Sequence, residues 1–368
     1  MNRWVALASD VARSNLMSRR LPFKLTLAVN YTCNCRCPMC SIWQRSSDGE
    51  MSLAEVERFF RRNGRWSWIN LTGGEILMKK GAPELVDLVL RHNPRLFLLD
   101  FPTTAFAPDR LLALVKQALG SGVRRLGVTV SLDGPPALHD ALRGVPGLFA
   151  KAMESMKRLR ALGDRRLIVK FGFTLQQANS DQLEAMITAV QEEIPDLSAD
   201  DIHLNAAQVS PHYYGNGDGG DRGVWGKEGW AESWADVVAG HVRRLEGRGP
   251  VSVLERLFLK GLVDYLRTGR SPVACSSLGS SVFVDPFWNV YPCVSWDRPL
   301  GNLREADFDL AALMKARVVR DAREQIAKRK CPDCWTACEA YQSLLGHGLG
   351  SAGLALKRGA GANETCDK

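Results

Sequence analysis

Between Cys40 and Cys275 this chain of 368 residues contains no cysteine at all. It also has no run of 18 apolar residues, the length that a membrane-spanning helix needs. The first 22 residues lack the continuous apolar core of a signal peptide. We therefore expect a cytoplasmic protein, in a reducing compartment where disulfides are rare. The ten cysteines then point to metal or redox chemistry.

A stripe of charge of one sign is missing as well. The net charge is +8, but the basic residues come as scattered pairs, such as Arg61-Arg62 and Arg124-Arg125, without interleaved aromatic side chains. This pattern favours a solvated surface, so we expect no nucleic-acid partner. Anionic substrates and an anionic membrane surface stay compatible with the charge.

The cysteines that are present form two groups. The stretch YTCNCRCPMC places Cys33, Cys35, Cys37 and Cys40 within eight positions. The other six come late: Cys275, Cys293, Cys331, Cys334, Cys338 and Cys366.

Strand and helix patterns alternate from residue 23 onward. Apolar runs predict strands over 23–30, 66–72, 95–101, 126–133, 167–175 and 201–207. Helix patterns follow at 51–62, 82–92, 108–120, 148–162, 181–194 and 231–245, the first with a Ser52/Glu55 capping box. Such βα units predict a parallel sheet covered by helices, either an incomplete barrel or an open sheet.

Unusual residues fall at the ends of these predicted strands, where the functional groups of parallel sheets collect. The cysteine group follows the first strand, and Gly73-Gly74-Glu75 follows the second. Thr103 follows the third strand, Ser131 and Asp133 end the fourth, and Asn179 follows the fifth. A long glycine-rich loop, 210–230, follows the sixth.

Cys33, Cys37 and Cys40 have the spacing CxxxCxxC. Three thiolates on one tight loop can hold three irons of a cubane iron–sulfur cluster and leave the fourth iron open. Cys35 alternates with them, so we expect its side chain to point away. Zinc is the rival metal, although it usually takes a closed set of four ligands.

With GGE after the second strand and SLDG at the end of the fourth, this motif resembles the radical S-adenosylmethionine (radical SAM) superfamily. The resemblance implies an α/β fold, a partial (β/α)6 barrel, in which SAM binds the open iron of a [4Fe-4S] cluster. It also implies reductive cleavage of SAM to a 5′-deoxyadenosyl radical, which abstracts a hydrogen atom from substrate. The expected SAM-binding residues are Met39, Gly73, Gly74, Glu75, Thr103, Ser131, Asp133, Arg143 and Asn179. Met39 departs from the family pattern, because an aromatic residue is usual before the third cysteine.

The late cysteines resemble the C-terminal auxiliary-cluster domains called SPASM or, when shortened, twitch. The resemblance rests on Cys275, Cys293, Cys331 and Cys334 and on the stretch FVDPFWNVYPC, where glycine is common in place of Trp288. Too few cysteines remain for two clusters, so we expect one auxiliary [4Fe-4S] cluster. Cys338 is a substitute ligand for Cys331 or Cys334, and a structural zinc site is the alternative.

An auxiliary cluster of this kind favours a net oxidation or a cross-link. We therefore expect the chain to be an oxidoreductase. Lipid or peptide modification with formation of C–C or C–S bonds is the alternative, and a non-catalytic iron–sulfur redox protein is a weaker one. The expected partner is an electron donor such as flavodoxin or ferredoxin. The substrate is a small molecule, a lipid or a peptide; only 22 residues precede the barrel, so a peptide substrate is expected to need leader recognition from elsewhere.

The glycine-rich loop supplies the expected substrate residues His212, Tyr213, Tyr214 and Trp225, with a disordered surface insertion as the alternative. We predict five regions: an amphipathic helix at 1–22, the radical SAM core at 23–245, a helical linker at 246–270, the auxiliary-cluster domain at 271–345 and a flexible tail at 346–368. For the first helix, packing across the bottom of the core is favoured over contact with a membrane surface through residues 1–20.

Overall fold

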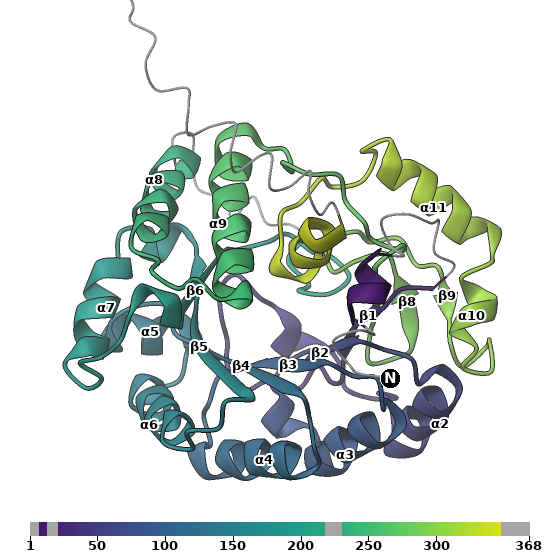
Figure 1. The fold of residues 1–368 in the computed structure, drawn as a ribbon, viewed down its shortest axis with the longest axis horizontal. Coiled ribbons are helices and arrows are strands. Elements are labelled where there is room, and N and C mark those ends of the chain that lie inside the picture. Colours follow the sequence, from purple (N-terminus) through teal and green to yellow (C-terminus); the bar gives the residue numbers. More distant parts are fainter. Residues whose placement is uncertain (1–6, 13–20, 218–229, 347–368) are drawn as a thin grey trace, which may run out of the picture.

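The computed structural model describes residues 7–12, 21–217 and 230–346 (Figure 1). Its centre is one sheet of nine strands in the order β6-β5-β4-β3-β2-β1-β7-β8-β9. Strands β1 to β6 are all parallel to their neighbours, which confirms the predicted α/β class and its six βα units. They span Lys24–Ala28, Trp68–Thr72, Leu98–Thr103, Arg125–Ser131, Leu167–Leu175 and Ile202–Ala206.

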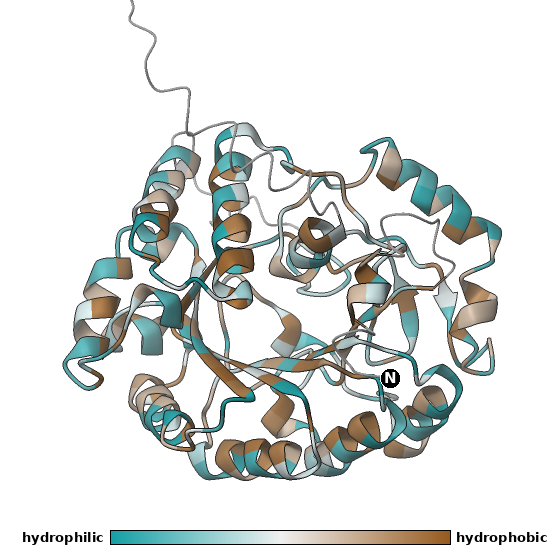
Figure 2. Cartoon of the chain, viewed as in Figure 1, coloured by the Kyte–Doolittle hydropathy of each residue, from teal (hydrophilic) through white to brown (hydrophobic). Residues whose placement is uncertain are grey.

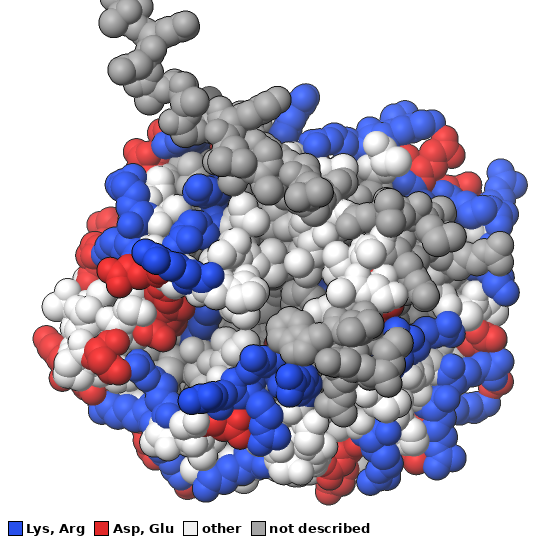
Figure 3. Space-filling model, in the orientation of Figure 1, with Lys and Arg blue, Asp and Glu red and all other residues white. Residues whose placement is uncertain are grey.

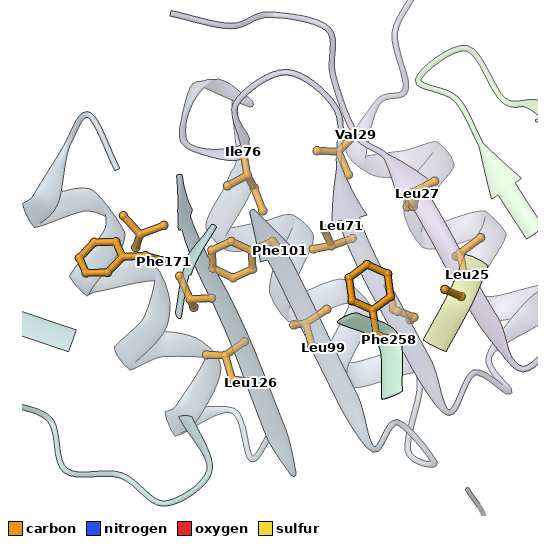
Figure 4. Packing of buried hydrophobic residues seen from close by; sticks show 14 of the residues in the cluster. Leu25, Leu27, Val29, Leu71, Ile76, Leu99, Phe101, Leu126, Phe171 and Phe258 are labelled. Atoms are coloured by element: carbon orange, nitrogen blue, oxygen red, sulfur yellow. The ribbon is translucent and has the colours of Figure 1, made fainter. Parts of the chain in front are cut away.

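Helices cover one face of this curved sheet, as the strand-helix alternation predicts. They are α2 (Leu53–Asn63), α3 (Ala82–His92), α4 (Pro108–Gly120), α5 (Pro136–Arg143), α6 (Leu148–Arg160), α7 (Leu183–Gln191) and α8 (Trp230–Arg243). Their apolar sides turn inward and their polar sides outward (Figure 2). Every second strand residue meets them, as Leu25, Leu27, Leu71, Leu99 and Phe101 do in Figure 4. This buried apolar layer holds the sheet and the helices together.

The opposite, concave face of the sheet is unusually polar. Lys24 lies over the ring of Trp68 at 4.2 Å, and Asn70 and Trp68 both donate hydrogen bonds to the carboxylate of Asp100. The cross-strand register Thr26↔Asn70↔Asp100 places these residues on one face. Part of α9 (Pro250–Thr268) and the helical residues 337–346 pack on this face, the latter in the hollow of the sheet (Figure 1).

The chain continues the same sheet after α9. Strand β7 (Ser281–Val284) pairs in parallel with β1, and β8 (Asn289–Tyr291) and β9 (Gly301–Asn302) add antiparallel neighbours. Trp288 occupies the turn between β7 and β8 with φ +69°. This left-handed conformation explains why glycine is common at the position, and it costs a non-glycine residue roughly 1–2 kcal/mol. The buried Trp288 ring offsets the cost by packing on Phe59 and Phe308.

Some elements were not predicted. Helix α5, which ends at Arg143, was not among the predicted helices. Helices α10 (Leu310–Leu313) and α11 (Arg317–Ala327), which were not predicted either, lie between Cys293 and Cys331 in the chain. The predicted domain boundaries stay predictions, since the sheet runs through both cysteine-bearing parts without interruption.

Residues 7–12 are helical, and Asp10 is buried where they meet the sheet. Its carboxylate accepts a hydrogen bond from Ser67 and lies 3.6 Å from Arg95, beside the starts of β2 and β3. Residues 7–12 therefore pack against the sheet, and the rest of the helix predicted at 1–22 stays a prediction, because residues 1–6 and 13–20 lie outside the described residues. In the described part of the chain no helix is both long and apolar enough to cross a bilayer. Lys and Arg side chains are scattered along the left, lower and right edges of the face in Figure 3, with Asp and Glu between them.

Candidate functional site: a thiol-lined cavity at the strand ends

The loop after β1 gathers the first group of thiols. Cys33 and Cys40 are partly buried, and Cys35 and Cys37 are buried. Cys35 does not line the cavity at the strand ends, as expected of a side chain that points away, but its thiol hydrogen-bonds with those of Cys33 and Cys37. These bonds lower the pKa of Cys33 and, with help from Arg143, bring the pKa of Cys37 to about 7. The loop therefore favours thiolates at two of the three predicted ligands, whereas burial raises the pKa of Cys40 to about 12.

Gly73 and Gly74 press against the start of this cysteine loop. The Gly74 and Glu75 amides donate to the carbonyls of Asn30 and Thr32, at 2.8 and 2.9 Å. A Cβ at Gly73 would lie 2.2 Å from the Asn30 carbonyl oxygen, and one at Gly74 would lie 2.2 Å from that of Thr32. Only glycine allows such an approach, which is the physical reason for two glycines here. The contact fixes the second strand's loop relative to the thiols.

Glu75 is a fully buried carboxylate that holds three hydrogen bonds but no cation. Leu77 N–H (3.0 Å) and Thr103 Oγ1 (2.7 Å) donate to Oε1, and Thr104 N–H (2.6 Å) donates to Oε2. Among the ion pairs of the described residues none involves Glu75. Burial raises its pKa, against the pull of these three donors. A buried carboxylate of this kind has free lone pairs and an unbalanced charge, so it is suited to receive an ammonium group.

Asp133 and Arg143 form a buried ion pair, with Nη2 and Oδ2 at 2.6 Å. Asp133 Oδ1 accepts from the amide of Thr174 at 2.9 Å, and its own amide donates to Nδ1 of His139 at 3.1 Å. Burial alone would lower the pKa of Arg143, but Asp133 and the thiols of Cys37 and Cys35 outweigh it and raise the pKa. The guanidinium therefore stays charged beside the cysteine loop, held there by Asp133.

The segment after β6 closes the other side of the site. Tyr213 Oη lies 2.7 Å from Thr72 Oγ1 and accepts from the amide of Gly73 at 3.0 Å. Asn216 donates to the Met39 carbonyl at 2.8 Å, and the Ser41 amide donates to the Tyr214 carbonyl at 2.8 Å. Residues 210–217 are thus fixed to both motifs, and residues 218–229 of the predicted glycine-rich loop, with Trp225, lie outside the described residues.

These elements surround a cavity of about 190 Å³ at the carboxyl ends of the strands. Nearly all of the expected SAM-site residues line it, together with two of the four expected substrate residues: Cys33, Cys37, Met39, Cys40, Gly73, Gly74, Glu75, Thr103, Ser131, Arg143, Tyr213 and Tyr214. Asn179, Asp133 and His212 do not. The side-chain amide of Asn179 donates to the backbone carbonyls of Asp133 and Thr174. His212 stacks on Tyr291, and its ring lies 3.2 Å from the Cys293 carbonyl.

The late cysteines gather beside the concave face, near but apart from the cavity. The thiols of Cys293 and Cys334 hydrogen-bond, and Cys334 acts electrostatically on Cys275, Cys331 and Cys338. Cys331 is half-buried. Cys366, the last cysteine of the sequence, lies outside the described residues. In the described part of the chain no three His, Cys, Asp or Glu side chains converge on one point as the ligands of a single ion do.

A second polar cluster inside the sheet was missed by the sequence reasoning. Glu255 of α9 accepts from Tyr341 at 2.9 Å, pairs with Lys170 at 3.2 Å and lies 2.8 Å from His203 Nδ1. Burial opposes its ionisation, but His203, Lys170 and Tyr341 prevail and bring the pKa to about 2. The sequence contains a signal for this cluster, because Lys170 in LIVKFGFTL and His203 in DIHLNAA are polar residues within otherwise apolar strands.

Comparison with known proteins agrees with this geometry. The family model described as "Radical SAM superfamily" matches residues 27–190. Residues 27–190, a little under half of the chain, are thus similar to the radical SAM superfamily. Its cofactors, SAM and a [4Fe-4S] cluster, are thereby confirmed as those expected from the sequence. The described residues fit them, since the cavity combines thiols, a glycine cradle and a buried carboxylate without a cation.

The curated relatives of this chain are distant. The sporulation killing factor maturation protein SkfB of Bacillus subtilis is 25% identical over 179 residues, which cover 47% of this chain and 41% of SkfB. An AdoMet-dependent heme synthase of Oleidesulfovibrio alaskensis is 30% identical over 141 residues, which cover 37% and 34% of the two chains. The chain therefore spans less than half the length of these curated relatives.

Solved structures share the fold over most of the chain. Streptococcus suis SuiB bound to S-adenosylmethionine superposes with a TM-score of 0.57 at 14% identity, over 86% of this chain and 70% of SuiB. The structure titled "Native anSMEcpe with bound AdoMet" gives a TM-score of 0.56 at 15% identity, over 91% and 99% of the two chains. At such low identity these likenesses establish the fold and nothing more.

Proposed function

We propose that the chain is a radical SAM enzyme that oxidises or cross-links a peptide. The observation that carries the proposal is the cavity in which Cys33, Cys37 and Cys40 meet the uncompensated carboxylate of Glu75. When bound, the cluster supplies the electron that cleaves the sulfonium of SAM and so generates the 5′-deoxyadenosyl radical that abstracts a hydrogen atom.

The residues of the chain position and enclose these groups. Cys33, Cys37 and Cys40 would hold three irons, and Glu75 would accept hydrogen bonds from the SAM ammonium. Arg143, held by Asp133, would offer its fork to the methionine carboxylate.

Other lining groups would complete the cofactor and substrate contacts. Ser131 and Thr103 offer hydroxyl groups to the SAM ribose, and Met39 offers an apolar contact to the adenine. Tyr213 and Tyr214 close the cavity toward the late cysteines and limit water access.

The late cysteines would hold one auxiliary [4Fe-4S] cluster. Cys275, Cys293 and Cys334 interact with one another, and Cys331 or Cys338 can complete the set. Between the two thiol groups stand Tyr213 and Tyr214, which pack with Cys33, Cys40 and Cys338 in one buried cluster. This proximity supports a role for the auxiliary cluster in accepting an electron from a substrate radical, which gives a net oxidation. The primary electron donor would be a flavodoxin or a ferredoxin.

A peptide is the favoured substrate class because of the proteins this chain resembles. SkfB is named as the maturation protein of a killing factor, SuiB has been solved with a precursor peptide SuiA, and anSMEcpe has been solved with the Cp18Cys peptide. A tetrapyrrole is the second candidate, favoured by the match to AdoMet-dependent heme synthases.

Two measurements test the proposal. Reduced, reconstituted protein should cleave SAM to 5′-deoxyadenosine under anaerobic conditions, and a variant with Cys33→Ala, Cys37→Ala and Cys40→Ala should not. Equal cleavage by that variant contradicts the cluster assignment. Comparative mass spectrometry of wild-type and deletion cells then separates the substrate classes: a peptide that lacks its modification supports the proposal, and an accumulated tetrapyrrole supports the second candidate.

A further inference from the structure

Glu339 is a buried carboxylate in the middle of the late cysteines. It follows Cys338 in the helical residues 337–346 and is 3% exposed. Its charge acts on the thiols of Cys275, Cys293, Cys334 and Cys338, so all four lie within its electrostatic reach. No motif in the sequence singles this residue out.

The two oxygens of Glu339 differ. Oε2 accepts from Ser281 Oγ at 2.5 Å and from Gln342 Nε2 at 2.8 Å. Oε1 is completely buried and has no hydrogen-bond partner among the residues that the structure describes. The donors on Oε2 fix the carboxylate in one orientation and leave Oε1 unused.

The protonation state does not resolve this imbalance. An ionised Oε1 lacks a donor, and a protonated Oε1 would lack an acceptor for its hydrogen. Either way a buried polar atom goes unpaired, which costs about 1–3 kcal/mol. Lys24 does not relieve it, since its Nζ donates to the Cys338 carbonyl at 2.6 Å and to Gln342 Oε1 at 3.0 Å. A metal cation bound at Oε1 would supply the partner that this oxygen lacks.

We propose that Glu339 Oε1 is an iron ligand, which completes the auxiliary cluster together with the thiolates of Cys275, Cys293 and Cys334. The proposal rests on the auxiliary cluster of the proposed function and assigns its fourth ligand. Of the two remaining thiols, Cys331 is only half-buried, and Cys338 packs toward Tyr213 and Tyr214 instead. Ser281 and Gln342 act as the supporting partners that orient a metal-bound carboxylate.

An oxygen ligand has a chemical consequence for the cluster. Replacement of thiolate by a less strongly donating ligand raises the reduction potential of iron–sulfur clusters. A cluster with three thiolates and one carboxylate therefore accepts an electron more readily than an all-cysteine cluster. This property suits the acceptor of an electron from a substrate radical.

The test uses the full-length chain with Cys33→Ala, Cys37→Ala and Cys40→Ala, in which only the auxiliary cluster can form. Iron content and the electron paramagnetic resonance spectrum are compared for this protein, for the same protein with Glu339→Gln, and for a control with Asp100→Asn. Asp100 is a partly buried carboxylate that also has an electrostatic effect on Cys338, but both of its oxygens are hydrogen-bonded. As a direct probe, glutamate labelled with ¹³C at the side-chain carboxyl is incorporated and its coupling to the reduced cluster is measured.

The expected result is about four irons in the starting protein, a loss of about one iron or an altered spectrum in Glu339→Gln, and no such change in Asp100→Asn. The labelled carboxyl should show a resolved coupling, which decides the matter even if Glu339→Gln fails to fold. No coupling, or a Glu339→Gln protein with the same iron content and spectrum, overturns the ligand assignment while the auxiliary cluster stands. A starting protein without iron overturns the auxiliary cluster itself and the ligand assignment with it.

Discussion

At the scale of single residues, Glu75 shows most directly how the site is prepared for a cation. Its carboxylate is surrounded by N–H and O–H donors, and it takes part in none of the ion pairs of the described residues. We predict that Glu75→Gln weakens SAM binding by about 2 kcal/mol, because a charge-assisted hydrogen bond to the ammonium is lost. Anaerobic calorimetry of the reconstituted protein measures this change. The control is Glu50→Gln, since Glu50 is a partly buried carboxylate that does not line the cavity. Equal SAM affinities of the Glu75→Gln and Glu50→Gln variants would show that Glu75 does not bind SAM.

His139 is a second residue with a measurable signature, the pH dependence of stability. Its Nδ1 accepts the amide hydrogen of Asp133, and burial followed by the charge of Arg143 lowers its pKa to about 3. Since the folded pKa lies below the ordinary value of 6.5, the unfolded chain binds a proton first as the pH falls. Stability linked to His139 is therefore complete above pH 6.5 and is lost between pH 6.5 and 3.

We predict that His139→Asn, which keeps an acceptor near Nδ1 but does not titrate, flattens this acid limb. The stability difference between wild type and variant should shrink by about 2 kcal/mol from pH 7 to pH 5, since one pKa unit corresponds to about 1.4 kcal/mol. Urea unfolding at a series of pH values provides the measurement. A constant difference over that range would mean that His139 is protonated alike in both states.

At the scale of elements, residues 210–217 join three parts of the molecule. They bond to the cysteine loop through Met39 and Ser41, to the glycine turn through Gly73, and to the late cysteines through Cys293 and Val294. The segment is thus a fixed wall of the cavity. Replacing all of it should damage the SAM site, unlike the replacement of a mobile lid.

Tyr213→Phe tests this wall with a single atom. Loss of the hydroxyl leaves the partly buried Gly73 amide without its acceptor, so we predict a loss of about 1 kcal/mol in unfolding free energy and a weaker affinity for SAM. Tyr214→Phe, which leaves the bonds to Thr72 and Gly73 intact, should change neither quantity appreciably. Denaturant unfolding and SAM titration measure both effects, and indistinguishable variants would contradict the bracing role of Tyr213.

At the scale of the whole molecule, the two thiol groups predict two clusters. Anaerobic reconstitution should give about eight irons per chain if both are cubanes, and the variant with Cys33→Ala, Cys37→Ala and Cys40→Ala should keep about half. Metal analysis and electron paramagnetic resonance provide the measurement. A chain with about four irons and one zinc would instead assign the late cysteines to a structural zinc site.

The sequence predicts the helices and strands of this molecule well where neighbouring residues determine the local structure. Helices α3 and α4 and strand β5 lie at the predicted residues, and the Ser52/Glu55 capping box is present. Periodicity, proline at the first turn and capping residues are properties of neighbouring positions, so they can be read along the chain. The cavity-lining set follows from strand ends and motifs in the same way.

Contacts between distant segments could not be predicted in this manner. The bond between Tyr213 and Gly73, the position of Cys35 between its neighbours and the burial of Glu339 all depend on how loops meet in space. The ion pair of Asp133 with Arg143 likewise joins two residues that the sequence had named only separately as SAM-binding residues. Their residue types were visible, but their partners were set by tertiary packing.

The pairing of β1 with β7 has a consequence for synthesis and for fragments of this chain. Two strands that lie side by side, Lys24–Ala28 and Ser281–Val284, are made more than 250 residues apart. Until the second leaves the ribosome, β1 presents an open edge, and Lys24 has no Cys338 carbonyl or Gln342 side chain to receive its ammonium group. An exposed edge strand invites pairing with other chains. A fragment cut at residue 245 would keep that edge permanently, so we expect it to aggregate where the longer chain does not.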